Sequence, residues 1–252
     1  MQVESVARAT PRSARIFAWL GLGLGIACVL AELLAGFGHR LGWWDFGVGI
    51  SVLSSAALTS TVALLASLIG TPLAVRSRAR PLIVAALAGL VVAALAAGIP
   101  AYYYFLARHV PPIHDISTDT DNPPRFVAAL QARDGAPNGV EYSAATAAQQ
   151  KQAYPDIAPA LMGVPPRVAF ARSLDAARSL GWQIIASVPA EGRIEAVDTS
   201  LLFGFNDDIV IRIAADGEQT RVDVRSLSRV GRSDIGANAR RIRAFLRKLG
   251  AP

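Results

Sequence analysis

IFAWLGLGLGIACVLAELLAGF, residues 16–37, is the first of three long apolar runs in this chain, and it contains one charged residue, Glu32. The second run covers residues 46–69 and the third covers residues 82–105, and neither contains a charge. A helix rises about 1.5 Å per residue, so each run is long enough to cross the ~30 Å hydrocarbon core of a bilayer. The sequence therefore predicts three transmembrane helices within residues 16–106, and not buried helices of a soluble core.

Arginines flank these runs unevenly. The N-terminal tail, residues 1–15, contains Arg8, Arg12 and Arg15, whereas the loop after the first run contains only Arg40, which Asp45 balances. The loop after the second run contains three arginines, at positions 76, 78 and 80. By the positive-inside rule, the tail and the second loop are cytoplasmic. Three spans then place the C-terminal part outside the cytoplasm of a bacterium, in the periplasm or at the cell exterior. We interpret the first run as a retained helix, because it is longer than a signal-peptide core and two more runs follow.

Glu32 is the one carboxylate inside these runs, and an intramembrane carboxylate is a functional hypothesis by default. We favour a structural role, in which Glu32 reaches the interface or bonds to a Ser or Thr of the second run. The alternative is a proton or ion path, which would make the protein a transport accessory subunit. Gly21 and Gly25 form a small-xxx-small pair that favours close helix packing, either among these three helices or in a homo-oligomer.

The C-terminal half is long enough to bury a core of its own. Residues 107–124 contain two Pro-Pro pairs and no apolar periodicity, which predicts a linker before a domain at residues 125–252. His114, Asp115, Asp119 and Asp121 are types that bind hard cations, but they lack the spacing of a calcium loop. The sequence predicts neither a metal site nor a cofactor. Cys28 is the only cysteine, so the outer domain has no disulfide.

Periodicity in the domain predicts a helix, four strands and a second long helix. Asp216-Gly217 is typical of a tight hairpin. Short connections between the strands indicate an antiparallel four-stranded meander with helices on one face, in a helix-grip-like α+β domain beside the α-helical membrane region. Ser233 is predicted as the N-cap of the last helix. The expected elements are short helices near residues 126–133 and 144–153, a helix at 166–180, strands at 182–188, 193–205, 209–214 and 221–227, a turn at 206–208, and a helix at 233–249.

Three segments resemble a bacterial domain-of-unknown-function family, the one numbered 1499 (DUF1499). They are IHDISTD at residues 113–119, FGFNDDIVIRI at 203–213 and VDVRSLSRVGRSDIGANARRIRAF at 222–245. The resemblance covers roughly residues 110–250 and leaves the apolar runs outside. It implies a bacterial source and a folded domain. Because the family has no established activity, the resemblance implies no catalytic residues.

Basic residues concentrate at the C-terminal end. Residues 107–252 contain 18 basic and 16 acidic side chains, and seven of the basic ones lie in the last 24 residues. Arg225, Arg229, Arg232 and Ser233 could form an anion site at a helix N-terminus. Asp234 already lies at that helix start, however, and Arg225 could pair across strands, so we favour a structural charge network. Arg240, Arg243 and Arg247 could face anionic lipid headgroups, but an ordinary solvated helix face is the simpler interpretation.

The residues favour no enzyme class. Asp207 and Asp208 could bind a metal or share acid and base roles, but two aspartates at a predicted turn are usually turn formers. No nucleophile elbow, zinc-binding helix, phosphate loop or dinucleotide fingerprint is present in the sequence. The expected location argues against nucleic acid as a partner, despite a pI near 10.1.

We therefore hypothesise a non-catalytic, membrane-anchored module of the cell envelope. Its expected partners are the lipid bilayer and either an envelope protein or an anionic lipid or cell-wall component. An envelope enzyme using Asp207 and Asp208 is the alternative, and a transport accessory subunit is a third.

Overall fold

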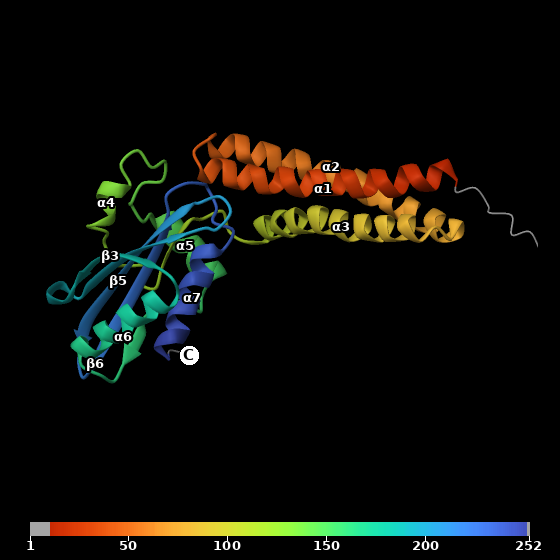
Figure 1. Ribbon diagram of the computed structural model, residues 1–252. Coiled ribbons are helices and arrows are strands. Elements are labelled where there is room, and N and C mark those ends of the chain that lie inside the picture. The colour runs from red at the N-terminus through yellow and green to blue at the C-terminus, as the bar shows by residue number, and fades with distance from the viewer. Residues whose placement is uncertain (1–10, 251–252) are drawn as a thin grey trace, which may run out of the picture. The chain divides into compact units, whose positions relative to one another are not determined.

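The structure is a computed structural model that describes residues 11–250, and it divides into two compact units (Figure 1). The first unit comprises residues 11–105 together with 202–204. The second comprises residues 106–201 and 205–250. Each unit has its own core. Arg8 of the predicted cytoplasmic tail lies outside the described residues.

Three long helices form the first unit: α1 (Arg12–Arg40), α2 (Phe46–Ser77) and α3 (Arg80–His109). Each is long and apolar enough to cross a membrane, as the sequence predicted. Helices α1 and α3 extend beyond their apolar runs at both ends, and α2 extends beyond its run at the C-terminal end only. The added turns contain the flanking arginines, which are good helix formers. Asp45 caps α2 by accepting a hydrogen bond from the backbone N–H of Val48 at 3.1 Å.

Small residues form the interior of this bundle. A Cβ added to Gly21 would lie 2.2 Å from the Ser67 hydroxyl, and one added to Gly89 would lie 2.7 Å from the backbone nitrogen of Leu22. The large apolar side chains point outward instead; Leu58 is 73% exposed. Close backbone approach through glycine, alanine and serine is how helices pack in lipid, where large side chains gain nothing from burial. The predicted Gly21 and Gly25 pair therefore packs within these three helices.

The second unit is built on one antiparallel sheet with strand order β1-β6-β5-β4-β3, and β2 also pairs with β6. Its last four strands form the predicted meander, and Asp216 pairs with Gln219 across the predicted hairpin between β5 and β6. The fold class is thus confirmed. The strands are β1 (Asp115–Ser117), β2 (Ala160–Met162), β3 (Gln183–Val188), β4 (Arg193–Thr199), β5 (Asn206–Asp216) and β6 (Gln219–Ser228).

Three features of the sheet differ from the prediction. The sheet has two additional strands, β1 and β2, of three residues each, and β1 lies within the stretch expected to be a linker. Strand β4 ends at Thr199 and not near residue 205. Asn206, Asp207 and Asp208 lie in β5 and not in a turn. Strands of three residues leave no periodic signal, and they form here because the long strand β6 offers its free edge to both.

Two helices cover one face of the sheet and close the main core (Figure 1). They are α6 (Pro166–Ser179) and α7 (Ala237–Leu249). Alternate residues of the strands point toward them, among them Ile211 and Val224, which are fully buried. Trp182 stacks on Phe245 with ring centroids 5.5 Å apart. The helices therefore lie on one face, as the apolar alternation predicted.

The opposite face of the sheet is covered as well. A small cluster of Phe126, Ala129, Val210 and Leu227 joins it to the segment that contains α4 (Ala129–Ala132). Helix α5 (Ala144–Ala153) follows, and Ser143 caps it through the N–H of Thr146. The covering segment carries few large apolar residues, so polar contacts must attach it to the sheet.

Candidate functional site

Charged side chains line the sheet face that the segment 118–142 covers. In a strand, successive side chains point to opposite faces, so Asp208 and Arg212 of β5 and Asp223 and Arg225 of β6 all point away from the α6 and α7 core. The register sets Arg212 opposite Asp223. Asp208, Asp223 and Arg225 are at most 3% exposed. This is the largest concentration of buried charge in the described domain, so it is the first candidate for a site.

Arg225 is held on every side. It donates to both oxygens of Asp115 at 3.0 and 2.7 Å, and to the carbonyl oxygens of Pro124 and Val140 at 3.2 and 2.7 Å. Its guanidinium also lies over the rings of Phe126 and Tyr142, 5.0 and 5.5 Å from their centroids. The fork geometry of arginine suits a bidentate carboxylate, and its planar faces suit aromatic rings. Asp115 and Arg225 therefore join β1 and the covering segment to β6.

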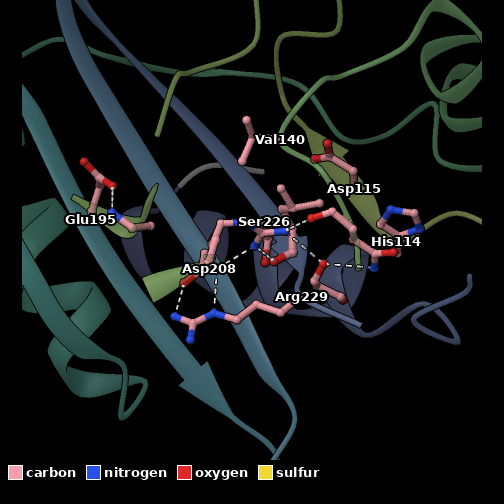
Figure 2. Close-up of polar contacts among 12 residues, drawn as sticks. His114, Asp115, Val140, Glu195, Asp208, Ser226 and Arg229 are labelled. Atoms are coloured by element: carbon pink, nitrogen blue, oxygen red, sulfur yellow. Dashed lines mark hydrogen bonds and ion pairs between the residues drawn. The ribbon is translucent and has the colours of Figure 1, made fainter. Parts of the chain in front are cut away.

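Asp208 accepts from two arginines, as Figure 2 shows in part. Arg133 approaches it at 2.5 Å, and Arg229 approaches it through Nε and Nη2 at 2.9 and 2.7 Å. The carboxylate of Asp208 is fully buried, and its hydrogen bonds raise the pKa of the Arg229 guanidinium. Arg133 comes from the covering segment and Arg229 from the end of β6. One carboxylate thus holds two separate segments.

Asp223 and Asp119 share a second pair of arginines. Arg212 reaches Asp223 at 2.8 Å and Asp119 at 2.9 Å, and Arg221 lies 3.0 Å from each. Burial acts to raise the pKa of Asp119, but hydrogen bonds from the N–H groups of Asn122 and Asp121 and from Arg212 outweigh it, so the pKa of this carboxyl lies below its ordinary value.

Glu195 fixes the start of α4. Its two carboxylate oxygens accept from the backbone N–H groups of Val127, Ala128 and Ala129 at 2.9 to 3.1 Å, and the side chain of Arg193 also contacts it. Free N–H groups at a helix start favour a negative charge, so the carboxylate satisfies donors that would otherwise be unpaired. Glu195 is fully buried. Nothing in the sequence signals this contact, since 66 to 68 residues separate its partners.

Together these ion pairs and hydrogen bonds attach residues 115–142 to the sheet. The predicted structural charge network is therefore present, and Arg225 pairs across strands with Asp115 of the neighbouring strand β1. The donors of Arg225 and Arg229 are directed at protein carboxylates, whereas Arg232 is exposed on the following loop. Arg225 and Arg229, two of the four residues predicted for an anion site, therefore donate to carboxylates within the domain instead of facing solvent.

Asp207 and Asp208 point to opposite faces of β5. Asp207 pairs with Arg241 of α7 at 2.7 Å, whereas Asp208 faces Arg133 and Arg229. The predicted turn at these residues is wrong, since both lie in β5, and adjacent side chains of an extended strand diverge. The two groups do not converge on a shared metal or proton.

The cation-ligand types near the domain start also diverge. Asp115 pairs with Arg225, Asp119 with Arg212 and Arg221, and Asp121 with Lys151 at 2.8 Å. The His114 ring nitrogen Nδ1 lies 3.2 Å from the carbonyl oxygen of Arg232. Each of these three aspartates therefore has an arginine or lysine partner of its own.

Helix α7 begins at Ala237, four residues after the predicted N-cap Ser233. Asp234 organises the start instead, because its carboxylate accepts from the N–H groups of Gly236 at 2.7 Å and Asn238 at 2.8 Å. Ile235 adopts a left-handed φ of 53°, so the helix cannot begin earlier. Burial raises the pKa of Asp234. The helix start is thus already occupied by a carboxylate.

Polar groups of β6 and α7 meet beside this helix start (Figure 2). Asn238 is buried; its amide nitrogen donates to the carbonyl oxygen of His114 at 2.9 Å, and Ser226 donates to its amide oxygen at 2.7 Å. Arg241 completes the group by reaching Asp198 and Asp207. These contacts attach α7 to the sheet.

A surface hollow of about 570 Å³ lies beside α4 and is lined by residues 130–140. Leu130 and Val140 expose apolar surface there. Arg133 forms part of its wall, and its Nε is buried without a hydrogen-bond partner in the described chain. Because this nitrogen is sealed from solvent, a molecule in the hollow does not reach it.

The outer surface of the two-helix layer is basic. We call it the basic helix surface, and six exposed side chains define it: Arg167, Arg172 and Arg178 of α6, and Arg240, Arg247 and Lys248 of α7. Asp175 is the only acidic residue in the sequences of the two helices, and it lies 4.0 Å from Arg178. Arg243 is not part of this surface, because Asp156 engages it at 2.6 and 2.7 Å. From the sequence, Arg240 and Arg247 were candidates to face lipid headgroups, as was Arg243, whereas Lys248 and the three α6 arginines were not.

Glu32 lies within the helix bundle, and its Oε1 is buried without a hydrogen-bond partner in the described chain. The predicted bond to a Ser or Thr of α2 is therefore wrong for this oxygen. The hydroxyls of Ser51, Ser55 and Thr59 instead donate to carbonyl oxygens one turn earlier in their own helix, at 2.8 to 2.9 Å.

The two units define a class of protein: a bundle of three membrane-length helices joined to an α+β domain whose second sheet face is sealed by buried ion pairs. The chain belongs to the family described as Protein of unknown function (DUF1499), whose sequence profile matches residues 115–249. This confirms the family resemblance, and the match begins at β1, inside the stretch expected to be a linker. No curated protein and no solved structure matches the chain.

Proposed function

We propose that the protein is an integral protein of a bacterial inner membrane that holds a non-catalytic DUF1499 domain outside the cytoplasm. In this proposal the domain binds an anionic component of the cell envelope, and the bound chemistry is phosphate or carboxylate. The basic helix surface is the docking surface. The observation that supports it most directly is the contrast between two groups of basic residues in one domain.

The arginines of the sealed sheet face are neutralised by buried carboxylates, so they have no remaining charge to offer. Those of the basic helix surface are exposed, and one acidic residue accompanies six basic ones. Each basic residue near an anionic surface contributes about 1 kcal/mol of attraction. Six such residues on two adjacent helices therefore favour an anionic partner that is extended, such as a lipid surface or a wall polymer.

A non-catalytic role is supported by the geometry of the carboxylates. Asp207 and Asp208 diverge, and Asp115, Asp208 and Asp223 each pair with arginine. A general acid or base must be free to exchange a proton with a substrate. Buried ion pairs of this kind hold a fold together and do not meet that need.

The proposal is tested with the full chain in nanodiscs of zwitterionic phosphatidylcholine. Binding is measured to added vesicles that contain phosphatidylglycerol and, separately, to a soluble glycerol-phosphate polymer; the two arms distinguish a lipid surface from a wall polymer. The variant R247Q/K248Q removes two charges, about 2 kcal/mol, so the expected loss of affinity is about 30-fold. Raising the salt concentration weakens binding of the unmodified chain.

The matched control is R125Q/K151Q, which removes two exposed basic residues outside α6 and α7. It leaves affinity within about threefold, because scattered surface charges contribute little. Equal loss in both variants shows that net charge and not this surface is responsible. The proposal is overturned if the unmodified chain binds neither of the two anionic probes.

A further inference from the structure

Glu32 occupies an interior position of α1. The buried residues of this helix include Ala14, Ala18, Gly21, Gly25, Cys28 and Ala35, which are separated by three or four positions, or by seven between Cys28 and Ala35. Glu32 is the missing member of that series, four residues after Cys28. Residues with this spacing share one helix face. The side chain of Glu32 therefore points between the helices, consistent with its buried Oε1.

Two close approaches fix the register of α1 against α3. A Cβ on Gly89 would meet the backbone nitrogen of Leu22, and a Cβ on Gly25 would meet that of Ala93 at 3.4 Å. At this level the two helices run parallel with an offset of 67 or 68 positions, and we extend this offset along α1 to Glu32. Glu32 lies level with residues 99 and 100. Helical side chains lean toward the N-terminus, which brings its carboxyl group to the level of Ala96.

The carbonyl group of Ala96 lacks its usual donor within α3. Residue 100 is proline, which has no N–H to donate to the carbonyl four residues earlier. Ala96 is only 1% exposed, and a buried carbonyl without a donor is costly. A carboxylate at Glu32 supplies no donor, whereas a neutral carboxylic acid supplies one O–H.

We propose that Glu32 is a proton-binding site of the helix bundle, whose neutral acid donates its O–H to the carbonyl oxygen of Ala96. This inference rests on the proposed insertion into a membrane. Loss of the proton would leave a charge and an unpaired carbonyl between α1 and α3, so the bound proton holds the two helices together.

No charged partner competes for this carboxyl within the described spans. The titratable groups nearest to Glu32 along α1 and α3 are Cys28 one turn earlier, His39 and Arg40 at the end of α1, and three tyrosines near the end of α3, at positions 102–104. The remaining ones of these two helices lie near the helix ends: Arg12, Arg15, Arg80, Arg108 and His109. Helix α2 carries no charge between Asp45, which caps it, and Arg76. A hollow of about 440 Å³ between α1 and α2 is lined by residues that flank Glu32 on α1, Cys28 and Ala31, and it admits a small apolar reagent.

The first test uses dicyclohexylcarbodiimide, an apolar reagent that requires a protonated carboxyl. The acid O–H adds across one C=N bond to give an O-acylisourea, which rearranges to a stable N-acylurea; no group leaves and no oxidant is needed. The full chain in phosphatidylcholine nanodiscs is treated between about pH 5 and about pH 9, and its peptides are weighed by mass spectrometry. We expect an adduct on Glu32 that diminishes as the pH rises and is absent in E32Q. A water-soluble carbodiimide should not label it.

The second test identifies the hydrogen-bond partner by infrared spectroscopy. The carbonyl stretch of a protonated carboxyl should be present in the unmodified protein and lost in E32Q. P100A restores an N–H for the Ala96 carbonyl, so the stretch should move to higher frequency as the acid loses its acceptor. P72A changes the proline inside α2 and is the matched control, which should leave the stretch in place.

The outcomes separate the two proposals. A chain that is extracted from membranes by alkali overturns membrane insertion and the Glu32 site with it. A chain that stays inserted, but shows no Glu32 adduct at any pH and no protonated carboxyl stretch, overturns the proton site alone. A stretch that P100A leaves unmoved, or that P72A moves equally, overturns the assignment of Ala96 as its acceptor.

Discussion

At the scale of residues, this domain separates buried charges from exposed ones. Buried arginines such as Arg225 have carboxylate, carbonyl and aromatic partners together, whereas pairs such as Lys151 with Asp121 lie in water. A desolvated pair is costly to break, since one ion remains buried without compensation, while an exposed pair contributes little. The two kinds of pair should therefore respond very differently to the same substitution.

The change D115N tests the buried pair. It leaves the Arg225 guanidinium buried without a carboxylate, so we expect the domain to lose about 3–5 kcal/mol of stability. Hydrogen exchange of the β6 amides in the full chain measures the loss. The matched change D121N removes the exposed carboxylate that pairs with Lys151 and should cost less than about 1 kcal/mol. Comparable protection of β6 in the two variants would contradict the conclusion that the Asp115–Arg225 pair holds β1 and the covering segment on β6.

Asp119 gives the domain an acid-sensitive contribution. Because its folded-state pKa is depressed, its contribution to stability is present above the ordinary value of 3.8 and is lost as the pH falls through the folded-state value. In D119N the thermal unfolding temperature should therefore change less steeply below about pH 4 than in the unmodified chain. Circular dichroism across acidic pH measures this. T120A, a neutral neighbour, should retain the original slope.

At the scale of elements, the bundle depends on where its glycines lie. Gly89 faces the backbone of Leu22, whereas a Cβ on Gly98 of the same helix would meet nothing within 4 Å. G89A should therefore separate α1 from α3 and destabilise the bundle by about 1–3 kcal/mol. G98A should stabilise it slightly, by up to about 1 kcal/mol, because alanine favours helix. Unfolding in a sodium dodecyl sulfate titration measures both, and the two changes must have opposite signs if this packing is correct.

The start of α7 is a second test at this scale. D234A removes the acceptor of the Gly236 and Asn238 N–H groups and should cost about 1 kcal/mol. S233A should cost less, because the Ser233 hydroxyl accepts only from Ile235, at 3.2 Å. Hydrogen exchange in the first turn of α7 distinguishes them. A greater loss of protection in S233A than in D234A would show that Ser233 is the N-cap, as the sequence predicted.

Long periodic elements and the short helices α4 and α5 were predicted from the sequence, but the three-residue strands were not. The three apolar helices, α6 and the β5–β6 hairpin follow from runs and alternations of ten or more residues. The three-residue strands β1 and β2 form because β6, which pairs with β5 along its whole length on one side, offers its other edge to segments far away in sequence. Asp207 and Asp208 look like turn formers locally, and only pairing with β4 and β6 makes them part of a strand.

At the scale of the whole molecule, the arrangement across a membrane is the decisive prediction. By the positive-inside rule, the arginine distribution predicts that the N-terminus lies in the cytoplasm and the domain outside it. A fluorescent protein that matures only in the reducing cytosol, fused after Pro252, should stay dark, and the same protein fused before Met1 should be bright. Bright cells from the C-terminal fusion would overturn the proposed location of the domain and its envelope partner.

Sequence alone determined the membrane-length helices, the α+β class of the domain and its family, because these depend on hydrophobic runs, alternation and residue order that local physics can read. Only the tertiary structure decided which charged side chains are paired within the protein. It paired Arg225 with Asp115 and Glu195 with the start of α4, and it separated Asp207 from Asp208. It also left the six residues of the basic helix surface exposed. The physical reason is that burial and partner geometry depend on segments that lie far apart in the sequence, and no local pattern contains them.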